Sequence, residues 1–169
     1  NHNRSGDVPL NLPPPFKTFR ITRFHMMREL EGLTDEQMVY IPEGREDNIL
    51  WNVGHLLCSI SRLTYVFSGH PLPIPEGYLA LFGKDTSARD WKESPDVQTV
   101  VDRFVELAKQ IEFDYQNEIF KVYKALQIVP EDNIASVEEA IAFHCFHEGL
   151  HIGKILTLKE AMGLPVKGG

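Results

Sequence analysis

Cysteine is scarce in this sequence of 169 residues: the chain holds only Cys58 and Cys145. A single pair in a chain of this length differs from the dense cysteine framework of small secreted domains. We therefore expect two free, buried thiols in a reducing cytoplasm, and a disulfide between them is the alternative that sequence alone leaves open.

The sequence also lacks long apolar runs and an excess of positive charge. Its longest apolar stretch, 49–67, is interrupted by Asn52, His55, Ser59 and Arg62, so it does not predict a membrane span. The net charge of -7 argues against binding to nucleic-acid phosphates or to an anionic membrane surface. We expect a cytoplasmic protein whose partner is a small-molecule substrate rather than a nucleic acid or a membrane.

Helical periodicity is present, whereas convincing strand alternation is absent. The segment 1–15 is polar and proline-rich, so we expect a flexible N-terminal arm followed by a single domain over 16–169. The pattern predicts an all-α fold, a four-helix bundle. Its expected helices are residues 16–32, 48–68, 95–126 and 136–162.

The predicted helices carry recognisable start signals. Asn48 is a good N-cap for the second helix, and Ser136 with Glu139 forms a capping-box pattern at the start of the fourth. In the first helix we expect an apolar inner stripe and an outer face of charged residues. The inner stripe is Ile21, Phe24 and Leu30, and the outer residues are Arg20, Arg23, Arg28 and Glu29.

The stretch 69–95 is long and rich in proline and glycine, with a short helix expected near 76–82. A connection of this length is unusual inside a compact domain. It is long enough to span a helix of roughly 30 Å, so the second and third helices can run parallel.

Histidines carry the strongest chemical signal. His147 and His151 are four residues apart, which places them on one face of the fourth helix. Two imidazoles at this spacing can reach one cation, and His55 in the second helix is the best-placed third ligand. Two satisfied core histidines are the alternative. Three protein ligands leave open positions for water or substrate, which is typical of a catalytic metal site.

Two competing motifs overlap the same stretch. His147-Glu148-Gly149-Leu150-His151 has the H-E-x-x-H pattern of zinc proteases, but no downstream histidine or suitably placed carboxylate completes that site. Glu148 with His151 also forms one E-x-x-H half-motif of di-iron bundles, but the second half is missing. We expect Glu148 to be a solvated carboxylate, or one that supports the ligands, rather than a catalytic base.

These residues resemble the DinB-like superfamily, which includes YfiT-like metal-dependent hydrolases and bacterial low-molecular-weight thiol S-transferases. The matching segments are Asn48-x-x-Trp51-x-x-Gly54-His55-Leu56 and His147-x-x-x-His151-x-Gly153. The resemblance implies a four-helix bundle with a long crossover between helices 2 and 3, a three-histidine site for nickel, zinc or a similar ion, and a homodimer. It also implies thiol transfer to electrophiles or thiol-dependent isomerisation.

Other residues near the motifs have two open interpretations each. His144 departs from the family pattern, and it is either a group that contacts the ligands or substrate, or a core histidine bonded to a neighbour. Cys58 either approaches the site or is a small core hydrophobe. Asn48 and Trp51 either shape the rim or act as N-cap and core aromatic. Because His55 lies early in its helix, we expect the ion near one end of the bundle, bordered by 40–47.

The sequence therefore predicts a metal-dependent enzyme. His55, His147 and His151 hold one divalent transition metal, nickel or zinc first and iron or manganese next. The ion activates a thiol or water for transfer to a small electrophilic substrate, and a low-molecular-weight thiol is the expected cofactor. The alternatives are a metal-dependent hydrolase and a non-catalytic helical module that the metal braces.

Overall fold

Capping residues set where the long helices begin in the computed structural model, which describes residues 11–168. Asn48 accepts a hydrogen bond from the backbone N–H of Trp51, and Ser136 accepts one from Glu139, as expected. Helix α1 starts at Pro14, so the last residues of the predicted arm 1–15 form its first turn, and residues 1–10 lie outside the described part. The long helices are α1 (Pro14–Leu30), α3 (Ile49–Ser61), α5 (Val97–Gln116) and α6 (Val137–Ala161).

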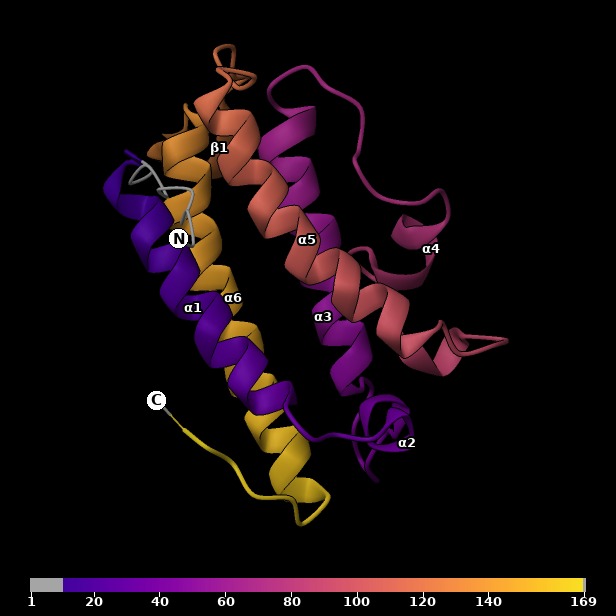
Figure 1. The fold of residues 1–169 in the computed structure, drawn as a ribbon. Helices are drawn as coiled ribbons and strands as arrows, with labels where there is room; N and C mark the ends of the chain where they lie inside the picture. The colour runs from indigo at the N-terminus through magenta and orange to yellow at the C-terminus, as the bar shows by residue number, and fades with distance from the viewer. Residues whose placement is uncertain (1–10, 169) are drawn as a thin grey trace, which may run out of the picture.

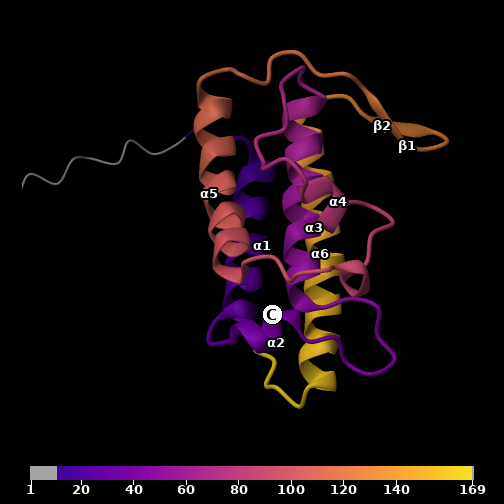
Figure 2. The same ribbon diagram turned by 90° about the vertical axis from the view of Figure 1, so that its right-hand side faces the viewer.

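The four long helices form the predicted bundle (Figure 1). The colour gradient in Figures 1 and 2 shows that α1 and α6 run in one direction and that α3 and α5 run in the other. The second and third long helices are therefore parallel, as the long connection allows. Helix α1 packs chiefly against α6, and α3 packs against both α5 and α6.

The connections hold short elements that position the site. Helix α2 (Asp35–Val39) follows α1 and begins with a capping box of Thr34 and Gln37. A π-helical turn, η1 (Arg62–Val66), extends α3. The crossover then contains the expected short helix, α4 (Tyr78–Phe82), and a 3-10 turn, η2 (Ala88–Asp90).

The third long helix is shorter than predicted. It ends at Gln116 rather than near residue 126, and Glu118 adopts a left-handed backbone conformation that breaks the helix. A two-stranded antiparallel hairpin, β1 (Leu126–Val129) and β2 (Asp132–Ile134), follows where no strand was expected. Ile134 of the hairpin packs with Leu63 and Ala140, so a small satellite core stabilises these short strands.

The predicted inner face of the first helix is wrong except for Leu30, which is buried in the core. Ile21 and Phe24 are largely exposed, whereas Arg23 and Glu29 are buried. The reason is that α1 meets α6 through ion pairs as well as through apolar contacts. Glu29 pairs with Lys159 of α6 at 2.7 Å, and Arg23 pairs with Glu148. Charged side chains enter the interior here because each meets an opposite charge.

Two smaller predictions have clear outcomes. The capping box of α6 is only half formed, because the Glu139 carboxylate accepts from the Ala135 N–H rather than from that of Ser136. Cys58 and Cys145 are free and buried, as expected, and burial raises their pKa values to about 12 and about 11.

No helix within 11–168 is long and apolar enough to cross a membrane.

The Glu29–Lys159 pair predicts a large stability effect. In Lys159→Met the Glu29 carboxylate, which is 1% exposed, loses its cation inside the protein. The free energy of unfolding should fall by about 3 to 5 kcal/mol, measured by urea denaturation. Lys17→Met on the exposed face of α1 is the control and should change it by less than about 0.5 kcal/mol. Equal effects of the two substitutions would contradict the structural role of the pair.

Candidate metal centre

His55 lies on α3 in a setting that leaves little freedom to its ring. Its Nδ1 is 2.9 Å from the carbonyl oxygen of Phe82 in α4, and its ring stacks on Trp51 with centroids 4.8 Å apart. The Phe82 side chain packs directly on Gly54, where an added Cβ would overlap its ring. The missing side chain of Gly54 therefore permits a close approach that brings α4 to the histidine.

His147 and His151 project from the middle of α6 toward α3. The Nδ1 of His147 is 3.1 Å from the Ser59 hydroxyl, and the Nδ1 of His151 is 2.7 Å from the Asn52 side-chain oxygen. Asn52 is itself held, because its amide nitrogen donates to the Asp47 carboxylate and to the Asn48 carbonyl. Both rings of α6 are thus oriented by side chains of α3.

The three rings converge on one point. One nitrogen from each of His55, His147 and His151 lies within 4.8 Å of the other two. The Nε2 atoms of His147 and His151 are 3.1 Å apart, and the ring centroids of all three pairs are 4.7 to 5.3 Å apart. This is the arrangement in which three imidazoles can hold a single divalent ion with small side-chain adjustments.

The hydrogen bonds on the outer side of the rings also assign their protons. A carbonyl oxygen can only accept, so Nδ1 of His55 carries the hydrogen and donates it to Phe82. The Asn52 amide nitrogen donates to the Asp47 carboxylate and to the Asn48 carbonyl, so the Asn52 side-chain oxygen is the atom that faces His151. Nδ1 of His151 therefore also carries a hydrogen, which it donates to that oxygen. In both neutral rings the lone pair is consequently on Nε2, on the inner side. The Ser59 hydroxyl fits either tautomer of His147, because it can donate a hydrogen bond to Nδ1 or accept one from it.

Burial and mutual repulsion keep these imidazoles neutral. Burial lowers the pKa of His55, and it lowers that of His147 to about 4 with help from His144 and His55. Burial, together with His147 and His55, lowers the pKa of His151 to about 3. Neutral imidazoles are the form that binds metal ions, so the site does not have to lose protons at neutral pH.

Glu148 lies apart from the three rings. It is fully buried, so the expectation of a solvated carboxylate is wrong. Burial would raise its pKa, but the Arg23 guanidinium and His144 hold the pKa below its usual value. His144 is also fully buried, with Nδ1 3.4 Å from Glu148, and this matches its interpretation as a core histidine bonded to a neighbour. A role of either residue in supporting the ligands stays a prediction.

A cavity of about 460 Å³ adjoins the centre, and His55 and His147 form part of its wall. Cys58 also lines it, with Sγ 3.6 Å from the Tyr78 carbonyl oxygen that accepts from it. The remaining wall is mostly apolar and, among the described residues, contains no carboxylate; it comes from α3, η1, α4, the hairpin, α6 and the residues that directly follow η1 and α4. A volume of this size suits a small-molecule ligand.

The predicted place of the site needs correction. The histidines of α6 lie near the middle of that helix, not toward one end of the bundle. The loop 40–47 does not line the 460 Å³ cavity. It borders a separate cavity of about 270 Å³ on the Trp51 side, through Arg45, Glu46 and Asp47. The loop still reaches the centre, because Asp47 holds Asn52.

Sequence reasoning missed the residues that orient the rings. Asn52 and Ser59 lie three residues before and four residues after His55, so helical spacing placed them on the same face of α3. This helical spacing could have identified Asn52 and Ser59 from the sequence. The Phe82 carbonyl had no signal, because a backbone oxygen looks the same in every residue and only the crossover brings it near. Asn48 acts as the N-cap, and Trp51 packs on His55.

Comparison with known proteins decides the family. The sequence model of the DinB superfamily matches residues 18–155, a span that contains all three histidines of the centre. The chain belongs to the DinB superfamily. No curated protein matches this DinB-superfamily chain.

One solved structure extends the comparison to the fold. The DinB-superfamily chain is similar to YfiT from Bacillus subtilis, which is described as a probable metal-dependent hydrolase with an unusual four-helix bundle topology. The match covers 89% of this chain and 87% of that one, with a TM-score of 0.56 and 18% sequence identity. At this identity the likeness supports the shared fold alone, and it agrees with the predicted four-helix bundle.

Gly54 offers a test of how α4 supports the centre. In Gly54→Ala the added methyl group overlaps the Phe82 ring, so α4 must shift and the Phe82 carbonyl must move relative to His55. We expect a loss of about 1 to 3 kcal/mol in the free energy of unfolding, measured by urea denaturation. Gly149→Ala is the matched control, because its Cβ meets nothing within 4 Å and alanine favours the helix by about 0.5–1 kcal/mol. A stable Gly54→Ala protein would contradict the contact.

Proposed function

We propose that His55, His147 and His151 bind one divalent transition metal and that the protein is a metal-dependent enzyme acting on a small molecule. One observation carries the proposal: three neutral imidazoles face one point, and hydrogen bonds on the outer side of the rings assign the lone pair to Nε2 in two of them. Lone pairs gathered in a partly buried place favour a cation there. Such outer hydrogen bonds are typical of metal-ligating histidines.

Nickel and zinc are the ions that we favour, with iron and manganese next, because imidazole suits several divalent transition metals and geometry alone does not separate them. Three protein ligands leave a coordination position for a reactant. A divalent ion held there supplies Lewis acidity, which lowers the pKa of a coordinated thiol or water.

The reaction that we propose is transfer of a low-molecular-weight thiol to an electrophilic small molecule. The side chains in the cavity support a nucleophile that comes from outside the chain, since burial raises the pKa of the Cys58 thiol to about 12 and keeps it protonated. Within the described part of the chain, Arg62 and Lys84 are the charged residues of the cavity wall and no carboxylate joins them, which favours an anionic substrate or thiol. The mostly apolar wall favours a reactant with an apolar body.

Hydrolysis is the second candidate, because the similar solved structure, YfiT, is described as a probable metal-dependent hydrolase. A non-catalytic role, in which an ion only braces α3 against α6, is the third. The substrate-sized cavity beside His55 and His147 favours an enzyme over a brace. A cytoplasmic homodimer remains part of the proposal.

Metal content tests the ligand set directly. Wild-type protein incubated with zinc or nickel and then dialysed should retain about one ion per chain, measured by elemental analysis. His147→Ala and His151→Ala should bind at least about tenfold more weakly, because each loses one of three ligands. His70→Ala is the control, since this ring bonds to the Ile119 carbonyl outside the centre. A wild-type protein without metal, or ligand variants that keep it, would refute the centre.

Assays with and without thiol separate the proposed reactions. Metal-loaded protein is mixed with 1-chloro-2,4-dinitrobenzene and either cysteine, glutathione or coenzyme A, and thioether formation is followed by absorbance. Thiol transfer predicts turnover that needs both thiol and metal and that His151→Ala abolishes. Hydrolysis of p-nitrophenyl acetate without any thiol would instead favour the hydrolase. A non-catalytic ion that only joins α3 to α6 predicts neither activity, and removal of the metal would then only lower the midpoint temperature of thermal unfolding.

A further inference from the structure

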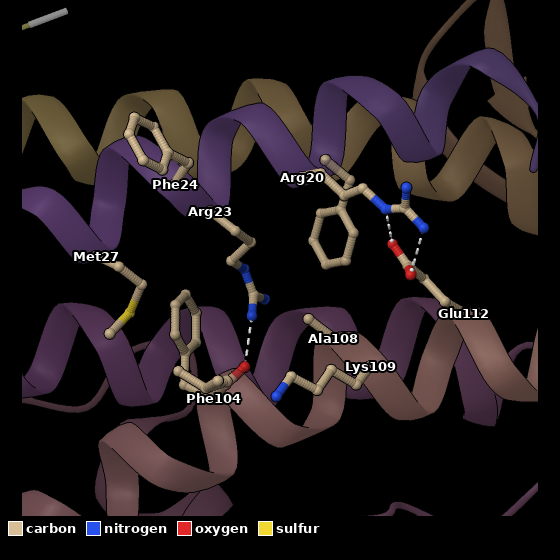
Figure 3. Close-up of a pocket in the computed structure, with 10 residues that line it drawn as sticks. Arg20, Arg23, Phe24, Met27, Phe104, Ala108, Lys109 and Glu112 are labelled. Carbon is tan, nitrogen blue, oxygen red and sulfur yellow. Dashed lines mark hydrogen bonds and ion pairs between the residues drawn. The ribbon is translucent and has the colours of Figure 1, made fainter. Parts of the chain in front are cut away.

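A second cavity lies between α1 and α5, apart from the three-histidine centre on α3 and α6. Its volume is about 410 Å³, and residues of both helices line it (Figure 3). It exists because α1 packs chiefly against α6 and α5 against α3, so α1 and α5 face each other across a groove. The apolar part of the lining is Phe19, Phe24, Met27, Phe104, Val105 and Ala108.

The charge of this groove is opposite to that of the chain. The protein carries a net charge of -7, but the groove is lined by the cations Arg20, Arg23 and Lys109 and by one carboxylate, Glu112. That carboxylate is already neutralised, because Arg20 donates to both of its oxygens, at 2.6 and 2.8 Å. Within residues 11–168 Lys109 forms no ion pair. Because Arg23 is paired with Glu148, Lys109 is the cation of this lining that no carboxylate within 11–168 offsets, and it favours an anion in the groove.

Arg23 adds a built hydrogen-bond donor. Arg23 is 8% exposed, and the central carbon of its guanidinium lies 3.5 Å from the centroid of the Phe104 ring. Nε donates to Glu148 and Nη1 donates to the Phe104 carbonyl, but Nη2 has no partner among the described residues. In Figure 3 the guanidinium reaches from α1 toward α5, between Phe104 and Ala108. Nη2 is itself buried, and an N–H without an acceptor is unfavourable there, so an acceptor that reaches Nη2 from the groove after a small shift of the lining side chains would be stabilising.

We propose that this groove binds a small apolar carboxylic acid, whose carboxylate accepts a hydrogen bond from Nη2 of Arg23 and whose hydrocarbon body fills the apolar lining. Lys109 at the edge attracts the anion, and Phe24, which is 61% exposed, gains cover from the ligand. A single carboxylate fits better than a phosphate, because one free donor and a mostly apolar wall cannot satisfy a dianion.

The test uses metal-loaded, ¹⁵N-labelled full-length protein titrated with octanoate and, separately, with 1-octanol. Both ligands have the same chain length, but only octanoate carries the charge. We expect saturable amide shifts in residues 19–27 and 104–109, with octanoate binding about tenfold more tightly or better. Ala108→Phe should weaken binding at least about tenfold by filling the groove, and Ala142→Phe on the exposed face of α6 should not.

Several results would overturn the proposal. The proposal is wrong if octanoate causes no saturable amide shifts, or if octanoate and 1-octanol bind with equal affinity. It is also wrong if the Ala108→Phe protein binds octanoate as tightly as the wild type does. Shifts confined to the neighbourhood of His147 and His151 would mean that octanoate binds the metal centre instead. Groove shifts that depend on protein concentration without ligand would mean that a second copy of the chain covers the groove. If Ala108→Phe fails to fold, Val105→Phe fills the same groove from the neighbouring turn and decides in its place.

Discussion

Each imidazole of the centre is anchored at its outer nitrogen, and the rest of the site depends on this constraint. The hydrogen-bond partners come from separate places: the Phe82 carbonyl on α4, and the Asn52 and Ser59 side chains on α3. Ring nitrogens that are shielded from water are usually hydrogen-bonded or bound to a metal ion. Since the outer acceptors use Nδ1 of His55 and His151, their inner nitrogens are left with lone pairs that face one another, and a cation is the partner that suits them all.

The crossover explains why such a site forms in a bundle of this topology. Because α3 and α5 are parallel, the chain must return along the length of the bundle between them, and α4 lies on that return path. Gly54 lets the Phe82 ring pack directly on α3. The same segment then supplies the carbonyl that orients His55 and part of the wall of the adjacent cavity, so a connection required by topology also builds the site.

Ion pairs, rather than an apolar stripe alone, join α1 to α6. Glu29 pairs with Lys159 and Arg23 pairs with Glu148, all in buried positions. This explains why the sequence pattern misled the assignment of the inner face of α1. Charged residues are normally placed outside, and a single helix does not reveal which opposite charge another helix will bring. The partial use of the Arg23 donors also leaves the charged groove between α1 and α5.

Helical periodicity, the caps at Asn48 and Ser136, and the spacing of His147 and His151 were sufficient to predict the bundle, the crossover and two rings on one face, because these features are local and repeat with the helix. His55 was a correct choice of neighbour for those rings, helped by the family resemblance. The end of α5, the hairpin and the buried charges were beyond reach, since each depends on contacts between distant segments.

The sequence by itself determined which imidazoles can gather, since helix geometry and the order of the segments are written in local patterns. Only the tertiary structure decided which nitrogen of each ring faces inward, which segments border the centre, and which charges are buried. Those outcomes depend on Phe82, Asn52 and Ser59 meeting rings that lie 27, 99 and 88 residues away along the chain. Hydrogen bonds and ion pairs between such distant partners exist only once the helices have packed.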